Sequence, residues 1–80
     1  MQVISGAQIR AARNLLGLSS REFAAFAEVS WATVKRFEEV DGIPPSRSGT
    51  LERVKAALEA AGIEFLGDPI HSPGVRLKRT

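Results

Sequence analysis

Residues 19–39 read SSREFAAFAEVSWATVKRFEE and contain two short apolar runs with helical spacing. The first run predicts a helix over about 20–27 and the second a helix over about 31–39, because apolar residues that recur every three or four positions line one face of a helix. Only three residues, EVS at 28–30, separate the two helices, so the chain must turn sharply between them. The residues expected to be buried are Phe23, Ala24, Ala27, Val34 and Phe37.

Serine residues mark three helix starts. A serine hydroxyl at the N-cap accepts a hydrogen bond from a backbone amide, and a glutamine or glutamate three residues later completes a capping box. This spacing occurs, with threonine in the third case, at Ser5–Gln8, Ser19–Glu22 and Ser30–Thr33. These signals predict helices that begin at about residues 6, 20 and 31.

Glycine and proline residues bound the other two helices. Gly17 ends a first helix over 6–16, and Gly62 ends a fourth helix that starts within 48–50. The segment 41–48, DGIPPSRS, is expected to be a loop. The residues expected to be buried on these two helices are Ile9, Ala12, Leu16, Leu51, Val54, Leu58 and Ala61.

Two short, mostly alternating runs close the chain and predict β-strands over 63–66 and 75–78. The expected fold is therefore mainly α, with four helices in a domain over 1–62 and a two-stranded β element in an extension over 63–80. An isolated hairpin is only marginally stable in water. We expect the strands either to fold over the first and fourth helices or to pair with a second copy of the chain.

The composition argues against an enzyme. The 80 residues include no cysteine and one histidine, His71, which falls in an expected loop. The acidic residues show no paired spacing suited to general acid–base catalysis, and no zinc or nucleotide-binding motif is present. We expect no catalytic residue, no cofactor and no metal site.

The charge and hydropathy of the sequence say more about the cellular compartment of the protein than about its binding partner. The net charge is +2, from 11 Lys and Arg against 9 Asp and Glu, which is a weak indication of a nucleic-acid partner. The N-terminus lacks the apolar core of a signal peptide. The longest apolar run, FAAFA over 23–27, is far too short to span a bilayer. We expect a cytoplasmic protein that does not associate with membranes.

Two short helices around a three-residue connection have the spacing of a helix-turn-helix, whose second helix can enter the major groove of DNA. This segment resembles the lambda-repressor-like, or Xre-type, DNA-binding family. The resemblance covers about 9–62, while GIEF at 62–65 and GVRL at 74–77 look like the ends of small bacterial regulators. The matching positions are Leu18, Ser19, Glu22, Ala24, Ala27, Val29, Ser30, Thr33, Val34, Arg36 and Glu38.

The resemblance implies a set of DNA contacts. It places base contacts at Trp31, Ala32, Lys35 and Arg36, and a backbone contact at Ser20. Ser30, Thr33 and Arg47 lie at helix starts and are expected to contact the DNA backbone as well, although Thr33 could instead bond to its own helix. Trp31 is then expected to touch thymine methyl groups and to donate its indole N–H to a base or phosphate; the alternative is packing against a neighbouring loop or a dimer partner. For each of the cations the alternative is a solvated charge, and for Ala32 it is a spacer.

The resemblance also implies a structural ion pair between Arg13 and Glu38, which would fix the second helix of the motif on the scaffold. Two residues depart from the family pattern. Ser20 replaces a glutamine and has less reach, and Glu28 replaces the turn glycine. A left-handed Glu28 would cost about 1 kcal/mol; otherwise the turn has a different geometry.

These features favour sequence-specific binding of a double-stranded DNA operator by a homodimeric transcriptional regulator, such as a repressor. A dimer is expected because one module has a small interface, and its half-sites would lie about 10 base pairs apart. The alternative is a protein-interaction module or an antitoxin-type protein that binds a toxin or another protein through the same helix face. A salt-dependent and sequence-selective affinity for DNA would indicate the regulator. A stable complex with another protein would indicate the alternative.

Overall fold

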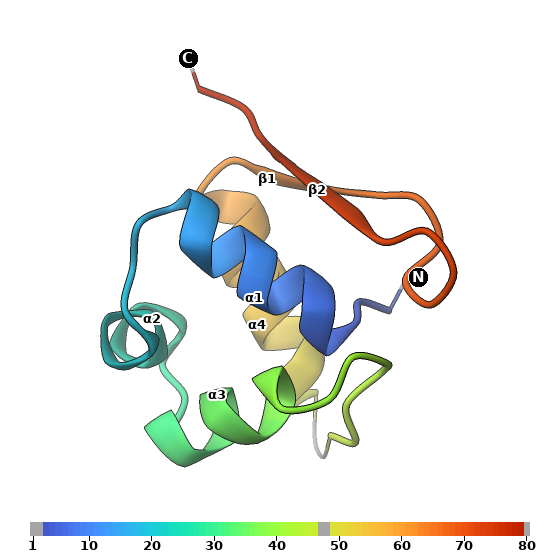
Figure 1. The fold of residues 1–80 in the computed structure, drawn as a ribbon. Helices are drawn as coiled ribbons and strands as arrows, with labels where there is room; N and C mark the ends of the chain where they lie inside the picture. Colours follow the sequence, from blue (N-terminus) through green and yellow to red (C-terminus); the bar gives the residue numbers. More distant parts are fainter. Residues whose placement is uncertain (1–2, 47–48, 80) are drawn as a thin grey trace.

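The computed structural model describes residues 3–46 and 49–79, and there the chain forms four helices followed by a two-stranded antiparallel sheet (Figure 1). The expectation of a mainly α chain with a short C-terminal β element is confirmed. Two helices and one strand end one residue earlier than expected. The elements are α1 (Gly6–Leu15), α2 (Ser20–Ala27), α3 (Trp31–Glu38), α4 (Thr50–Ala60), β1 (Ile63–Leu66) and β2 (Gly74–Leu77).

The predicted caps start the first three helices. In α1 the Gln8 amide donates to the Ser5 hydroxyl at 3.2 Å, and the Ser5 amide donates to Oε1 of Gln8 at 3.0 Å. Ser19 and Glu22 form the same reciprocal pair at the start of α2. Gly17 follows α1 with φ +72°, which is the left-handed conformation that a helix end commonly needs.

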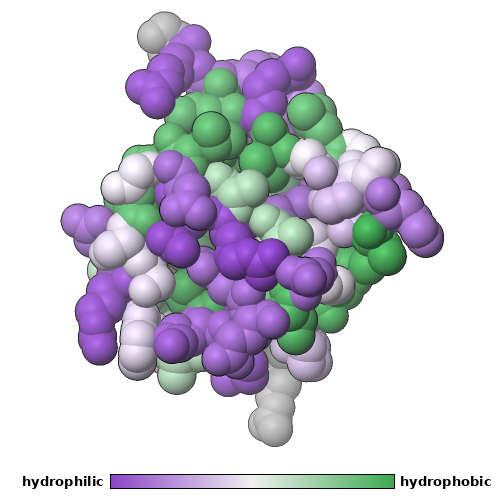
Figure 2. All heavy atoms as spheres, viewed as in Figure 1, coloured by the Kyte–Doolittle hydropathy of each residue, from purple (hydrophilic) through white to green (hydrophobic). Residues whose placement is uncertain are grey.

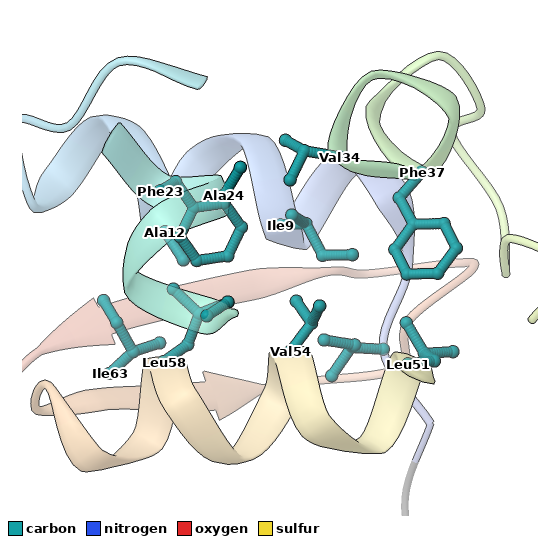
Figure 3. Close-up of a cluster of buried hydrophobic side chains, with 12 residues drawn as sticks. Ile9, Ala12, Phe23, Ala24, Val34, Phe37, Leu51, Val54, Leu58 and Ile63 are labelled. Carbon is teal, nitrogen blue, oxygen red and sulfur yellow. The ribbon is translucent and has the colours of Figure 1, made fainter. Parts of the chain in front are cut away.

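All four helices and β1 contribute to one hydrophobic core, which lies between α4 and the other three helices (Figure 3). Leu16 and Ala61, which were expected to be buried, are only half-buried, because each lies one residue past the end of its helix. The buried apolar residues are Ile4, Ile9, Ala12, Phe23, Ala24, Ala27, Val34, Phe37, Leu51, Val54, Leu58 and Ile63.

The two strands pair with each other within one chain and lie across α1 and α4 (Figure 1). Their register pairs Ile63 with Leu77 and Leu66 with Gly74, so β2 begins at Gly74, one residue before the expected start. This register lets the apolar side chains of alternate positions pack against the core. Nε2 of the buried Gln8 donates to the carbonyl oxygens of Leu66 and Gly74, at 3.3 and 3.1 Å, and so ties the hairpin to α1.

The start of α1 packs closely against the end of α3. A Cβ atom added at Gly6 would lie 2.0 Å from the carbonyl oxygen of Val40 and 2.3 Å from that of Phe37. The Gly6 amide donates to the Gly42 carbonyl oxygen at 2.8 Å. Only glycine allows this approach of two backbones.

In the described part of the chain, no helix combines the length and the apolar character that a membrane crossing requires.

Candidate functional site

The connection between α2 and α3 turns at a left-handed residue. Glu28 has φ +60° and ψ +44°, and its amide donates to the carbonyl oxygens of Ala24 and Ala25 at the end of α2. The Val29 amide donates to the Ala24 carbonyl oxygen at 3.0 Å. Of the two geometries considered for Glu28, the structure therefore has the left-handed one, in which a side chain costs about 1 kcal/mol.

Short polar side chains cap both helices of this segment. The Thr33 amide donates to the Ser30 hydroxyl at 3.1 Å, and the two hydroxyl oxygens lie 2.8 Å apart. At the start of α2 the Glu22 carboxylate accepts from the Ser19 amide at 2.8 Å. The bond from the Ser19 backbone amide, followed by that with its hydroxyl, lowers the pKa of Glu22 because both favour the charged carboxylate.

The helix α3 has one buried and one exposed face. Val34 and Phe37 are buried beneath it, as expected. Thr33 and Ser20 are half-buried and Ser30 is exposed, while Arg47 lies outside the described residues. The exposed face carries all of the residues to which base contacts were assigned, namely Trp31, Ala32, Lys35 and Arg36.

Trp31 is held in place by α2 and by its own helix. Its indole Nε1 donates to the Ser20 hydroxyl at 3.0 Å. Cζ of Arg21 lies 4.2 Å from the centroid of the indole ring, and Nζ of Lys35 lies 5.1 Å from it. Both distances are those of cation–π contacts. The side chain thus packs against its neighbours within the chain, yet the residue remains 38% exposed.

Arg13 and Glu38 form the ion pair that the resemblance implies. Nε of Arg13 lies 2.8 Å from Oε2 of Glu38, and Nη2 lies 3.0 Å from Oε1, so the pair is bidentate. Nη1 of Arg13 also donates to the Leu18 carbonyl oxygen at 2.9 Å. The side chains are only 18% and 11% exposed. The pair therefore joins α1, the start of α2 and the end of α3 in a partly buried setting.

Two arginines at the site were not predicted. Nη1 of Arg10 donates to the carbonyl oxygens of Glu38 and Val40, and Nη2 forms an ion pair with Asp41 at 2.7 Å. These bonds satisfy carbonyls at the C-terminus of α3, where a cation is favourable. The other is Arg21, which stacks on Trp31. Arg10 stands three residues before Arg13 on α1, and this spacing was the available sequence signal.

An open hollow of about 560 Å³ lies between α3 and the start of α4. Its lining is mixed polar and apolar and comes from Thr33, Arg36, Phe37, Pro45, Ser46 and Thr50. The Ser46 hydroxyl accepts from the Leu51 amide at 2.9 Å and so caps the first turn of α4. A hydroxyl-rich hollow with one arginine has the donors that a phosphate group requires.

The charges of this face are mixed. Hydrophilic side chains gather across the middle and lower part of the face in Figure 2, where α1 and α3 lie in the same view of Figure 1. Lys35 and Arg36 are exposed on α3, and Arg21 is exposed on α2. The exposed acids Glu28 and Glu39 flank them. This balance disfavours tight non-specific binding to a polyanion and favours binding through matched contacts.

Within residues 3–46 and 49–79, no three histidine, cysteine, aspartate or glutamate side chains lie close enough together to hold a metal ion. In comparisons with known proteins, no family model and no curated protein matches the chain. A functional interpretation therefore depends on the residues of the α2–α3 face.

Proposed function

We propose that this chain is a lambda-repressor-like helix-turn-helix protein that binds double-stranded DNA in a sequence-specific manner. In this proposal α2 and α3 form the motif, and the first turn of α3 enters the major groove. The exposed face of α3 is the observation that supports it best, because a fixed aromatic ring stands there among the cations Arg21, Lys35 and Arg36. Cations neutralise phosphates, and side chains in the groove read base edges.

The contacts that hold α3 against the rest of the chain support a role for this helix in recognising DNA bases. The bidentate Arg13–Glu38 pair and the bonds from Arg10 hold the C-terminal half of α3. The Trp31–Ser20 bond holds its first turn. A helix fixed at both ends can present its exposed side chains with little loss of conformational entropy on binding.

Backbone contacts are proposed on both sides of α3. Ser20, Ser30 and Thr33 lie at the starts of α2 and α3, where hydroxyls and helix amides can bind phosphate oxygens. Thr33 and Arg36 also line the hollow that faces α4, which has room for a phosphate group.

We further propose that the active form is a cytoplasmic homodimer that regulates transcription. One α3 helix can read only a few base pairs, and two half-sites about 10 base pairs apart would place both copies on one face of the duplex. Equilibrium sedimentation of the protein with the selected duplex tests this part. Two protein chains per duplex are expected, and one chain per duplex would contradict a dimeric reader.

Selection from a random pool of duplex DNA at physiological salt tests the proposed function. We expect a two-fold-symmetric site that binds about 10³-fold or more tightly than random DNA. Lys35→Ala should weaken binding and reduce the dependence of log K on log salt by about one unit if Lys35 contacts a phosphate. Lys78→Ala is the matched control, because Lys78 follows β2 at the end of the molecule opposite α3 (Figure 1).

A protein partner is the second candidate. Leu15 and Phe26 are 44% and 47% exposed, and exposed apolar side chains are common at protein interfaces. An antitoxin-type protein would bind such a partner through one of these side chains or through Trp31. Absence of any enriched DNA, together with a stable complex with a protein, would favour this candidate over the regulator.

A further inference from the structure

The side chain of Trp31 has one polar atom, and that atom already forms a hydrogen bond within the chain. An indole carries one N–H donor and no acceptor. In this structure the N–H donates to the Ser20 hydroxyl at 3.0 Å. The residue is nevertheless 38% exposed, so what the side chain offers to a ligand is a carbon surface. This differs from the expectation that the indole N–H would be available to a base or phosphate.

The carbon surface is held in one orientation and is bordered by positive charge. Cζ of Arg21 lies 4.2 Å and Nζ of Lys35 lies 5.1 Å from the ring centroid. Together with the bond to Ser20, these contacts restrain the ring from two helices: Ser20 and Arg21 belong to α2, and Lys35 lies one turn further along α3. A restrained ring loses little entropy when it meets a ligand.

The major groove offers one apolar group to such a surface. Base edges there present hydrogen-bond donors and acceptors, with the exception of the methyl group at C5 of thymine. A polar base edge placed against the Trp31 ring would lose water without gaining a hydrogen bond, which is unfavourable. A methyl group placed there loses nothing polar and buries apolar area.

We propose that Trp31 is a specificity-determining residue that selects a pyrimidine 5-methyl group, which in ordinary DNA means thymine, at one position of each half-site. This inference rests on the proposed DNA-binding function and adds the chemistry that the first residue of α3 recognises. Ser20, Arg21 and Lys35 act here as positioning residues for the ring.

A deoxyuridine scan of the selected duplex tests the inference. Replacing thymine by deoxyuridine removes one methyl group and changes no hydrogen-bonding group. We expect about fourfold weaker binding at one thymine position in each half-site, and about fifteenfold when both are replaced, as the burial of one methyl-sized group predicts. At the same position 5-methylcytosine should bind more tightly than cytosine by a similar factor.

Variants of the protein assign the effect to the ring. In Trp31→Ala the difference between thymine and deoxyuridine at that position should vanish, whereas Lys78→Ala should keep it. A repeat of the selection with Trp31→Gln provides a second readout if Trp31→Ala binds too weakly to measure, because glutamine pairs with adenine in the major groove. We expect adenine to replace thymine at that position in the selected site.

The possible failures are distinguishable. If a symmetric site is selected but deoxyuridine has no effect at any position, or if the effect persists in Trp31→Ala, the methyl inference is wrong and the proposed function stands. An unchanged thymine preference in the Trp31→Gln selection has the same meaning. If no DNA is enriched at all, the proposed function fails, and the inference that rests on it fails as well.

Discussion

The indole Nε1 of Trp31 donates to the hydroxyl of Ser20 at 3.0 Å, and this bond joins the first residue of α3 to the first residue of α2. It crosses the turn at Glu28 and links two side chains that are 11 positions apart. The bond therefore ties the start of α2 to the start of α3 and restrains the angle between the two helices. Its contribution can be measured apart from that of the core.

The Trp31–Ser20 bond should be visible in a double-mutant cycle. We expect Ser20→Ala to lower the free energy of unfolding by about 0.5–1 kcal/mol, a typical net value for one hydrogen bond. In a Trp31→Phe background the same change should cost close to nothing, because phenylalanine has no N–H to satisfy. Urea unfolding of the four proteins measures both values. Equal losses in the two backgrounds would show that the bond contributes nothing.

Loss of one partner of the Arg13–Glu38 pair should destabilise the protein strongly. We expect Glu38→Ala to lower the free energy of unfolding by about 3 kcal/mol, because it leaves a partly buried arginine without its carboxylate. The double change Arg13→Met with Glu38→Leu should be less destabilising than Glu38→Ala, since no charge is then left alone. Glu39→Ala, at the exposed neighbouring position, is the control and should change stability by less than about 0.5 kcal/mol. A Glu38→Ala protein as stable as Glu39→Ala would contradict this role.

Local signals in the sequence predicted the elements well, and tertiary contacts explain what they missed. The Ser5–Gln8 and Ser19–Glu22 caps each span three residues, so the sequence contains all of their parts. Helical spacing likewise separated Phe23, which is buried, from Phe26, which is 47% exposed. Such features need no knowledge of the fold.

The missed features depend on residues that meet only after folding. Gln8 bonds to the hairpin across 58 and 66 positions of the chain, and Arg10 bonds to the end of α3 across 28. The partner of the Trp31 indole could not be chosen before the angle between α2 and α3 was known. The Arg13–Glu38 pair was expected only through the family resemblance, because 25 positions separate the two residues.

Replacement of the left-handed Glu28 by glycine should stabilise the protein, whereas the same replacement at a helical residue should destabilise it. We expect Glu28→Gly to raise the free energy of unfolding by up to about 1 kcal/mol, because glycine adopts φ +60° without the steric cost. Ala25→Gly, on the exposed face of α2, should lower it by about 1 kcal/mol. Thermal or urea unfolding measures both. Destabilisation by both changes would mean that the flexibility of glycine in the unfolded chain outweighs the relief of strain at Glu28.

The close approach at Gly6 should make even one methyl group costly. We expect Gly6→Ala to lower the free energy of unfolding by about 2 kcal/mol, because the added Cβ would lie 2.0 Å from the Val40 carbonyl oxygen. Gly42→Ala is a matched control in the same region, where the added Cβ meets only the Ile70 side chain at 3.6 Å. Similar losses of stability in the two variants would contradict the proposed steric cause.

The protein should become less stable as the pH falls, because carboxylates whose pKa values are lowered in the folded state then become protonated. The side-chain hydrogen bond from Arg76 is the main cause of the lowered pKa of Glu64, while the His71 and Ile70 amides lower that of Asp68. A lowered folded pKa adds stability above the ordinary values of 4.5 and 3.8, and this stability is lost as the pH falls through the folded values. We therefore expect the melting temperature of the wild type to exceed that of Glu64→Gln at pH 6. The difference should shrink as the pH falls below about 4.5, because a protonated glutamate resembles glutamine in charge. A difference that stays constant from pH 6 to pH 2.5 would show that the charge of Glu64 contributes nothing to stability.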